Sequence, residues 1–102
     1  MIQTTVVNLR KEPYDVYIGR AGKGQDGYFG NPFDVRKHGK DALPLFIEYF
    51  HKRLTTDAEF HARVLALAGK KLGCFCAPRP CHGDVIATYV NGWKKAWEAA
   101  NP

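Results

Sequence analysis

Hydrophobic and polar residues follow strand-like patterns over three stretches of the chain. Residues 4–9 (TTVVNL) are rich in β-branched side chains and end at the charged turn RKEP. Residues 14–20 (YDVYIGR) alternate, and residues 71–76 (KLGCFC) form a third short run. The pattern therefore predicts three strands. The turn at residues 10–13 predicts that the first two pair as an antiparallel hairpin, since a parallel pair needs a longer crossover.

Apolar residues recur at helical spacing in the middle of the chain. Over residues 41–54 they fall every three or four positions, and Asp41 suits the N-cap. Thr56 and Glu59 have the spacing of a capping box, which predicts that a second helix starts there. We therefore expect two consecutive helices between the second and third strands.

A last helix is predicted to begin at Asp84. Its apolar residues follow helical spacing and include Trp93 and Trp97, which we expect to pack in the core. The resulting order is strand, strand, loop, helix, helix, strand, helix, without an internal repeat or linker. It predicts an α/β fold in which three or so strands are covered by about three helices, in one domain spanning residues 1–102.

A glycine-rich stretch at residues 21–39 is predicted to be a long loop. Loops of this length in small domains are commonly functional. The sequence YFGNPF places Phe29 and Phe33 on either side of a turn, and we expect both rings to pin the loop to the core. The amide of Asn31 has two interpretations, capping this turn or facing a ligand.

The charge of the chain favours anionic partners. Lys and Arg number 15 against 10 Asp and Glu, which gives a net charge of +5 and a pI near 9.2. This balance favours contact with nucleic acid, nucleotides or other phosphates. The basic residues are scattered along the chain, so a lysine surplus that only keeps the protein soluble explains the charge equally well.

Composition also indicates the compartment. No apolar run approaches the ~20 residues that a membrane span requires, and the start MIQTTVVNLRKEP lacks the features of a secretory signal. We therefore expect a cytoplasmic protein with no membrane partner. In a reducing cytosol, closely spaced cysteines are more often metal ligands or reactive groups than disulfides.

All three cysteines lie in one short segment, GCFCAPRPCHGD, with a histidine directly after the third. On a strand, Cys74 and Cys76 share one face. Cys81 and His82 follow a proline-bounded turn at the start of the last helix. The four side chains are therefore expected to lie close together, and three interpretations of the cluster are open.

The first interpretation is a metal site with Cys74, Cys76, Cys81 and His82 as ligands. Three thiolates and an imidazole match a tetrahedral zinc set, and iron is a less favoured occupant. The spacing C-x-C-x4-C-H is unusual, because ligation of one metal by adjacent residues is strained. Cys74 is the ligand that we expect to turn inward instead.

The second interpretation is catalysis by a reactive thiolate. Cys81 lies where a helix dipole and free amides lower the pKa of a thiol, and His82 and Asp84 are its candidate acid–base partners. In the third interpretation the cysteines only fill space, and Gly83 and Asp84 simply cap the start of the helix. In a functional variant of this interpretation, the amides from Cys81 to Asp84 form an anion site, which Arg20 and Arg79 close around a phosphate.

These interpretations agree on the place of the site. Ligands of α/β sheets bind beyond the carboxyl ends of strands, and two of the predicted strands end at Arg20 and in the cysteine segment. If those strands are parallel neighbours, Arg20 meets the loop at Gly30 and Asn31 and the turn at Cys81 and His82 at one edge of the sheet.

The segments NLR, YDVYIGR, GNPF, GKKLGCFC and PCHGDVI together resemble the domain-of-unknown-function family 4326, small proteins of bacteria and their phages. The resemblance covers almost the whole chain, although Phe75 stands where many relatives have tryptophan. It supplies no established activity and suggests a phage-type accessory protein. It implies that the following residues belong to the family pattern: Arg20, Asn31, Cys74, Cys76, Pro78, Cys81, His82 and Asp84.

The leading functional hypothesis is a small protein that binds the phosphate of a nucleotide or nucleic acid. Arg20, Gly30, Asn31 and Arg79 are its candidate ligand-binding residues, and a structural metal is expected beneath them. One alternative is an enzyme that acts on a nucleotide or sugar phosphate, with Cys81 as the nucleophile. A second is a phage-encoded interaction protein whose aromatic loop meets a host partner.

Overall fold

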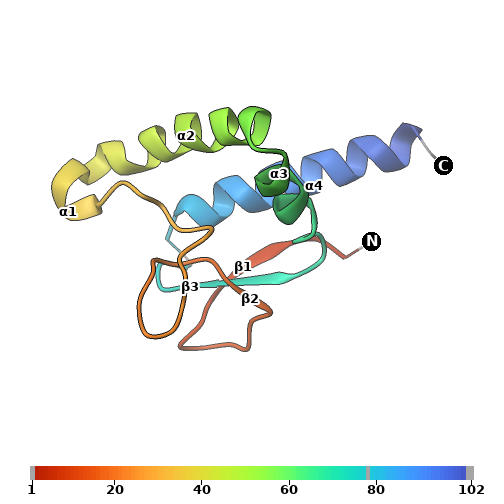
Figure 1. Cartoon of the computed structure of the whole chain (residues 1–102). Helices are drawn as coiled ribbons and strands as arrows, with labels where there is room; N and C mark the ends of the chain where they lie inside the picture. Colours follow the sequence, from red (N-terminus) through yellow and green to blue (C-terminus); the bar gives the residue numbers. More distant parts are fainter. Residues whose placement is uncertain (1, 78, 101–102) are drawn as a thin grey trace.

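The computed structural model describes residues 2–77 and 79–100, without the side chains of residues 35, 94, 97 and 98. Its helices lie on one face of a three-stranded sheet (Figure 1). The strands are β1 (Thr5–Asn8), β2 (Val16–Tyr17) and β3 (Lys71–Cys74). The longer helices are α2 (Ala42–Thr56), α3 (Ala58–Leu65) and α4 (His82–Ala100). The predicted α/β fold is confirmed.

The strands are parallel, and β3 lies between β1 and β2. The hairpin predicted for the first two strands is therefore wrong. Residues 9–15 carry the chain from the carboxyl end of β1 to the start of β2, on the face of the sheet opposite the helices (Figure 1). Because both strands are short, an extended connection spanning roughly 3.3 Å per residue makes this return without a helix.

Tyr14 lies at the point where this connection crosses the sheet. Its ring packs on Gly73 in β3, where an added Cβ would come within 2.6 Å of the Tyr14 Cγ atom. Glycine lets the two backbone segments approach this closely. The carboxylate of Asp15 then accepts a hydrogen bond of 2.8 Å from the Lys71 N–H group. The strand predicted over residues 14–20 shortens to β2, because its first residues serve the crossing.

The core lies between the sheet and the helices and is rich in aromatic rings. Trp93 is 42% exposed, so the prediction that it packs in this core is wrong. The reason is the length of α4, whose second half extends past the sheet and the other helices (Figure 1). The side chain of Trp97 lies outside the described residues. The largest buried side chains are Ile18, Phe46, Phe50, Phe60, Val64, Leu72, Ile86 and Val90.

Two helices begin at other residues than predicted. The N-cap of α3 is Asp57, whose carboxylate accepts a hydrogen bond of 3.0 Å from the Phe60 N–H group, so Thr56 and Glu59 do not form the predicted capping box. The last helix, α4, already begins at His82. In both cases an acidic side chain accepts a hydrogen bond from a backbone amide at the helix start, which is a common N-terminal arrangement.

The region before α2 is more ordered than the predicted loop. It ends in a helical turn, α1 (Val35–His38), followed by a turn of 3₁₀ helix at Gly39–Asp41. Because this turn runs directly into α2, Asp41 occupies the N-cap position without forming a side-chain cap hydrogen bond. Within the described part of the chain, no helix is both long and apolar enough to span a bilayer.

The first turn of α4 lies directly on the sheet. A Cβ added to Gly83 would come within 2.6 Å of the Ile18 Cδ1 atom and 3.2 Å of the Val6 methyl groups. Such distances leave no room for a larger residue. Gly83 therefore sets how closely the start of α4, with Cys81 and His82, approaches the strands.

Candidate functional site

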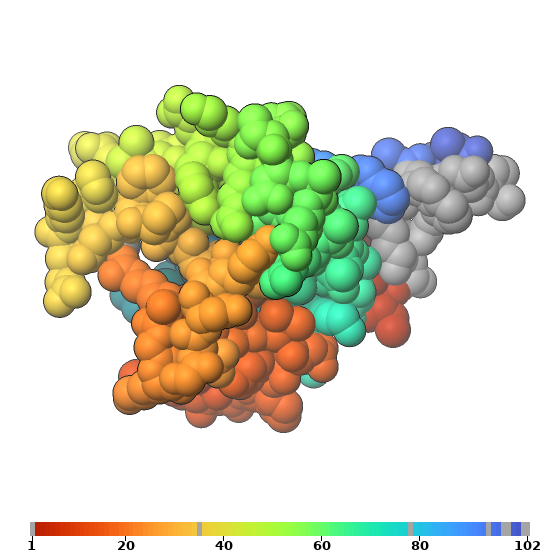
Figure 2. All heavy atoms as spheres, in the orientation of Figure 1, coloured from red at the N-terminus to blue at the C-terminus, as the bar shows by residue number. Residues whose placement is uncertain are grey.

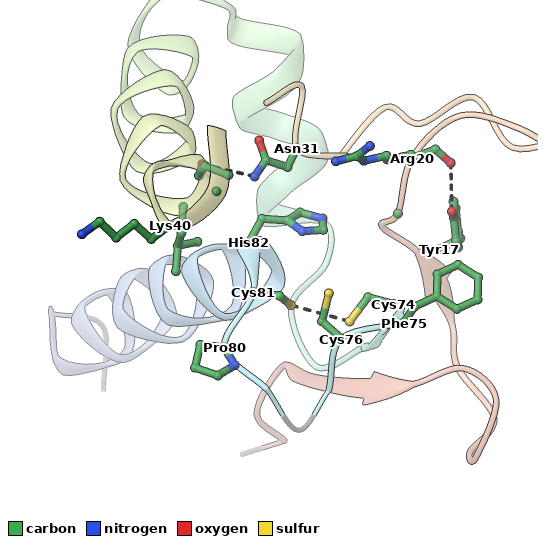
Figure 3. Close-up of a pocket in the computed structure, with 14 residues that line it drawn as sticks. Tyr17, Arg20, Asn31, Lys40, Cys74, Phe75, Cys76, Pro80, Cys81 and His82 are labelled. Carbon is green, nitrogen blue, oxygen red and sulfur yellow. Dashed lines mark hydrogen bonds between the residues drawn. The ribbon is translucent and has the colours of Figure 1, made fainter. Parts of the chain in front are cut away.

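A pocket of about 420 Å³ opens at the carboxyl edge of β2 and β3. Its wall comes from the ends of both strands, the start of α2 and the start of α4 (Figure 3). In the space-filling view, a hollow separates the segment that leads into α2 from the segment that follows β2 (Figure 2). The pocket therefore lies where several non-consecutive segments meet, as is common for ligands of parallel sheets.

The pocket gathers six of the residues that the sequence singled out. They meet because β2 and β3 are parallel neighbours. Gly30, Arg79 and Asp84 do not line it. Arg79 is exposed in the turn before α4, where its N–H donates a hydrogen bond of 2.8 Å to the Cys76 carbonyl. The predicted residues that line the pocket are Arg20, Asn31, Cys74, Cys76, Cys81 and His82.

All three cysteines line the pocket, but two of their thiols form a buried pair and the third is only half-buried. Cys74 and Cys81 are 1% and 6% exposed, and their sulfur atoms lie 3.6 Å apart. All three cysteines are free thiols. Cys76 follows the end of β3, is half-buried, and directs its sulfur toward the pocket (Figure 3). The inward orientation predicted for Cys74 is confirmed.

Asp84 caps the start of α4. The Cys81 N–H group donates a hydrogen bond of 2.9 Å to Asp84 Oδ2. This is one half of a capping box, in which a side chain of the first turn reaches back to the N-cap amide. Burial raises the pKa of the Cys81 thiol to about 12, and the Gly83 amide offsets only part of this rise. The predicted lowering of its pKa is therefore wrong, because desolvation outweighs the helix terminus.

Hydrogen bonds within the fold occupy two amides of the expected anion site. The Cys81 N–H group donates to Asp84 Oδ2, and the Asp84 N–H group donates a hydrogen bond of 3.0 Å to the Cys81 carbonyl. An anion would have to displace these partners and would meet the negative charge of the Asp84 carboxylate. The start of α4 therefore gives little support to an amide-based anion site, and a phosphate in this pocket depends on side chains.

His82 is buried and holds the end of β2. Its Nε2 atom donates a hydrogen bond of 2.6 Å to the Ile18 carbonyl, and its ring packs edge-on against Phe46 with centroids 5.3 Å apart. Burial lowers the pKa of His82 from its ordinary value of 6.5, and the nearby charge of Arg20 acts in the same direction. The imidazole is therefore neutral at pH 7.

The cysteine–histidine cluster does not converge on a metal position. The His82 Nε2 atom is committed to the Ile18 carbonyl, so the imidazole does not turn toward the paired sulfurs (Figure 3). Across residues 2–77 and 79–100, no three Cys, His, Asp or Glu side chains are arranged to hold a metal ion. The geometry therefore gives no support to the zinc or iron predicted from the sequence.

Two cationic residues line the pocket on opposite sides. Arg20 lies 3.5 Å from Asp34 Oδ1, and both side chains are partly exposed. A pair of this kind contributes only about 0–1 kcal/mol, so the guanidinium can exchange it for another anion. Lys40 comes from the 3₁₀ turn before α2, and its side chain extends away from the other lining residues (Figure 3).

Tyr17, Lys40 and Phe75 line the pocket although the sequence analysis did not select them. The Tyr17 hydroxyl donates a hydrogen bond of 2.8 Å to the Arg20 carbonyl and so fixes the backbone of that residue. The alternating pattern of YDVYIGR already placed Tyr17 on the face of the strand opposite Val16 and Ile18, and this was the one sign in the sequence that it lies outside the core. The sequence held no sign that Lys40 lines the pocket, because its position depends on the path of the preceding loop.

Asn31 lines the pocket and also shapes the loop. Its Oδ1 atom accepts a hydrogen bond of 2.8 Å from the Phe33 N–H group, and its Nδ2 donates one of 3.3 Å to the Ala42 carbonyl. These bonds support the turn-capping interpretation. Gly30 packs against Gly19, where an added Cβ would lie 2.7 Å from the Gly19 carbonyl oxygen. Both residues therefore set the shape of the wall.

The aromatic residues of this loop pack inward. Phe29 is partly buried against the core and lies 6.3 Å from the Phe60 ring centroid. Phe33 is half-buried and makes an edge contact with Tyr49 at 6.1 Å. The prediction that the ring packs on the core is confirmed for Phe29, whereas Phe33 contacts Tyr49, which itself packs against the core. Their packing does not favour a surface that meets a host partner.

Comparison with known proteins identifies the family. Residues 3–92 match the family described as Domain of unknown function (DUF4326). The chain is also similar to the "Uncharacterized 12.4 kDa protein in nrdA-td intergenic region" of Enterobacteria phage T4, with 40% identity over 86 residues, 84% of this chain and 76% of that protein. No solved structure matches the chain. The resemblance expected from the motifs is confirmed, and the chain belongs to the DUF4326 family.

Proposed function

We propose that this protein binds a nucleotide in the pocket at the carboxyl edge of β2 and β3, with Arg20 holding the phosphate. The observation that carries the proposal is the charge of the wall. Arg20 and Lys40 are cationic, burial keeps His82 neutral, and the described lining residues include no Asp or Glu. A concave site of one charge concentrates ligands of the opposite charge.

The dimensions and surface of the pocket agree with a small anionic ligand. Its volume of about 420 Å³ falls in the usual range of roughly 300–1,000 Å³ for small-molecule sites. Much of the wall is apolar, and the rings of Tyr17 and Phe75 offer surfaces on which a base can pack. A nucleotide combines the two properties that such a wall recognises, a flat apolar group and a phosphate.

Arg20 is the residue best placed to recognise the phosphate. Its planar guanidinium presents donors in a fork that matches two phosphate oxygens. Its present partner, Asp34, is a loose surface contact at 3.5 Å. The hydrogen bond from Tyr17 fixes its backbone, so less conformational freedom is lost when the side chain meets a ligand.

The alternative of an enzyme with Cys81 as nucleophile has less support. Its thiol is 6% exposed, and burial holds its pKa near 12, so it is protonated at neutral pH. All three cysteines line the pocket, and Cys76 is the least buried of them, so it is the thiol most open to a ligand. The proposal therefore assigns binding to this pocket and no covalent step to its cysteines.

The test is a calorimetric titration with nucleoside monophosphates and triphosphates at low salt, where phosphate contacts are strongest. We expect binding that the Arg20→Ala variant weakens about tenfold or more, as expected for the loss of a charge-assisted hydrogen bond. Lys52→Ala removes an exposed cation of α2 and should bind like the unmodified protein. Absence of binding, or equal weakening by both variants, would overturn the proposal.

A further inference from the structure

A second cleft, of about 450 Å³, lies beside the pocket and shares three of its lining residues. The shared residues are Tyr17, Arg20 and Phe75, so the two hollows meet along one wall. The second cleft is completed by the start of the β1–β2 connection and by the loop after β2. Its additional residues include Tyr14 and Lys23. The two hollows therefore adjoin, with Arg20 in the wall that they share, and together they are called the groove below.

Aromatic rings are unusually exposed along this groove. Phe75 is 47% exposed and Tyr14 is 40% exposed, and both line the second cleft. The Arg10 guanidinium carbon lies 4.9 Å from the centroid of the Phe75 ring. A guanidinium at this distance interacts favourably with an aromatic face and orients the ring. The ring is thus held in place while nearly half of its surface is open.

The loop after β2 presents a lysine in a strained position. Gly22 and Gln25 exchange two backbone hydrogen bonds, of 3.0 and 2.9 Å, and form a tight two-residue turn. Lys23 has φ of 48° and Gly24 has φ of 85°. Asn, Asp and Gly are the usual residues at such positions, and a lysine there costs on the order of 1 kcal/mol. The turn nevertheless places this cation at the second cleft.

The charge of the whole groove has one sign. Arg20, Lys23 and Lys40 line it, and neither hollow has an Asp or Glu among its described lining residues. Basic grooves with exposed rings are the common solution for single-stranded nucleic acid, because phosphates follow the cations while bases stack on the rings. Duplex nucleic acid does not offer its bases in this way.

We infer that the groove binds single-stranded nucleic acid, with one nucleotide in each hollow and the linking phosphate at Arg20. This inference rests on the proposed nucleotide site and extends it from one nucleotide to at least two. Phe75 is the stacking surface for a base, since its ring lines both hollows and is open to solvent. Lys23 contacts the phosphate of the second nucleotide.

The test compares ligands of increasing length by fluorescence anisotropy and competition. The probes are dTMP, fluorescein-labelled dT4, its uridine counterpart rU4, and a labelled DNA duplex long enough to stay paired at low salt. We expect dT4 or rU4 to bind about tenfold or more tightly than dTMP, which is the gain from one stacked base. Tighter binding of either strand than of dTMP supports the inference, and the two arms show whether DNA or RNA is preferred.

Variants of the second cleft separate this inference from the proposed function. Phe75 lines both hollows, so Phe75→Ala should weaken dTMP as well as dT4, with the larger loss for dT4, and Phe75→Trp should restore both. Lys23→Asn suits the left-handed backbone, so it should keep the fold while weakening dT4 several-fold and leaving dTMP unchanged. Lys52→Ala is the matched control, and circular dichroism checks that each variant is folded.

The other possible results distinguish the groove for single-stranded nucleic acid from the nucleotide pocket alone. Equal affinity for dTMP and dT4, or equal affinity for the single strand and the duplex, overturns the groove while the nucleotide pocket stands. Equal loss of dTMP and dT4 binding in Lys23→Asn also overturns it. Failure of every nucleotide and oligonucleotide to bind at low salt overturns both claims.

Discussion

The two sides of the cysteine segment have opposite properties. Cys74, Cys81 and His82 are buried and bonded to neighbouring groups in the fold. Phe75 is exposed and Cys76 is half-buried at the pocket. The three cysteines therefore differ in their access to a ligand although they lie within a few positions of one another. The difference shows that burial, more than residue type or the helix terminus, determines which groups can meet a ligand.

The sharpest test of this comparison is thiol reactivity. In native protein, iodoacetamide should modify Cys76 first, and Cys81 should react roughly a hundredfold or more slowly than in urea-unfolded protein, because its thiolate is scarce. Peptide mapping by mass spectrometry measures each site. Cys76→Ser should remove the fast reaction.

Two results would break the comparison. Fast modification of Cys81 in native protein would mean that its thiolate forms at neutral pH, as the enzyme alternative requires. Slow modification of all three thiols that EDTA accelerates would instead support the zinc site predicted from the sequence.

The buried side can be disturbed at Gly83, where α4 meets the strands. Gly83→Ala places a Cβ within 2.6 Å of Ile18 Cδ1, and we expect it to lower the free energy of unfolding by about 1–2 kcal/mol through overpacking. The control is Gly92→Ala in the same helix, where nothing lies within 4 Å. It should raise the free energy of unfolding by up to ~1 kcal/mol. Urea denaturation that gives both variants the same sign would contradict the close contact.

A smaller effect is expected from the buried histidine. Because the pKa of His82 is lowered in the folded state, the unfolded chain binds the proton more readily, and stability falls as pH drops below about 6.5. The slope for one such group is at most ~1.4 kcal/mol per pH unit. His82→Gln keeps a side-chain N–H donor and should flatten this part of the profile, whereas His51→Gln, at an exposed position, should not. Identical profiles for both variants would argue against a buried neutral His82.

Much of the fold was predictable because local patterns agree with it. The period of apolar residues located the strands and helices. The aromatic residues of the loop were expected to pack on the core. The family motifs marked Arg20 and the cysteine segment, which the structure brings to one pocket. The helix ends were less predictable, since Asp57 competed with the neighbouring Thr56 for the same capping role.

The sequence could not show how short strands are joined. The hairpin followed from a general rule on crossover length, and the rule failed because Tyr14 crosses the sheet over Gly73 in an extended connection. Trp93 matched the apolar period of α4 but lies where that helix has passed beyond the sheet. In both cases the outcome depends on how long a strand, connection or helix is compared with the elements beside it. The periodicity of apolar residues does not contain this information.

The sequence by itself determined the strands and helices, the family, and the residues from which one end of the pocket is built. Only the tertiary structure decided that β3 lies between two parallel strands, which brings Arg20, Lys40 and Cys76 to the same pocket. It also decided that Cys81 is buried and that its pKa is raised. The physical reason is that desolvation and proximity depend on residues far apart in the chain, whereas capping and periodicity depend on near neighbours.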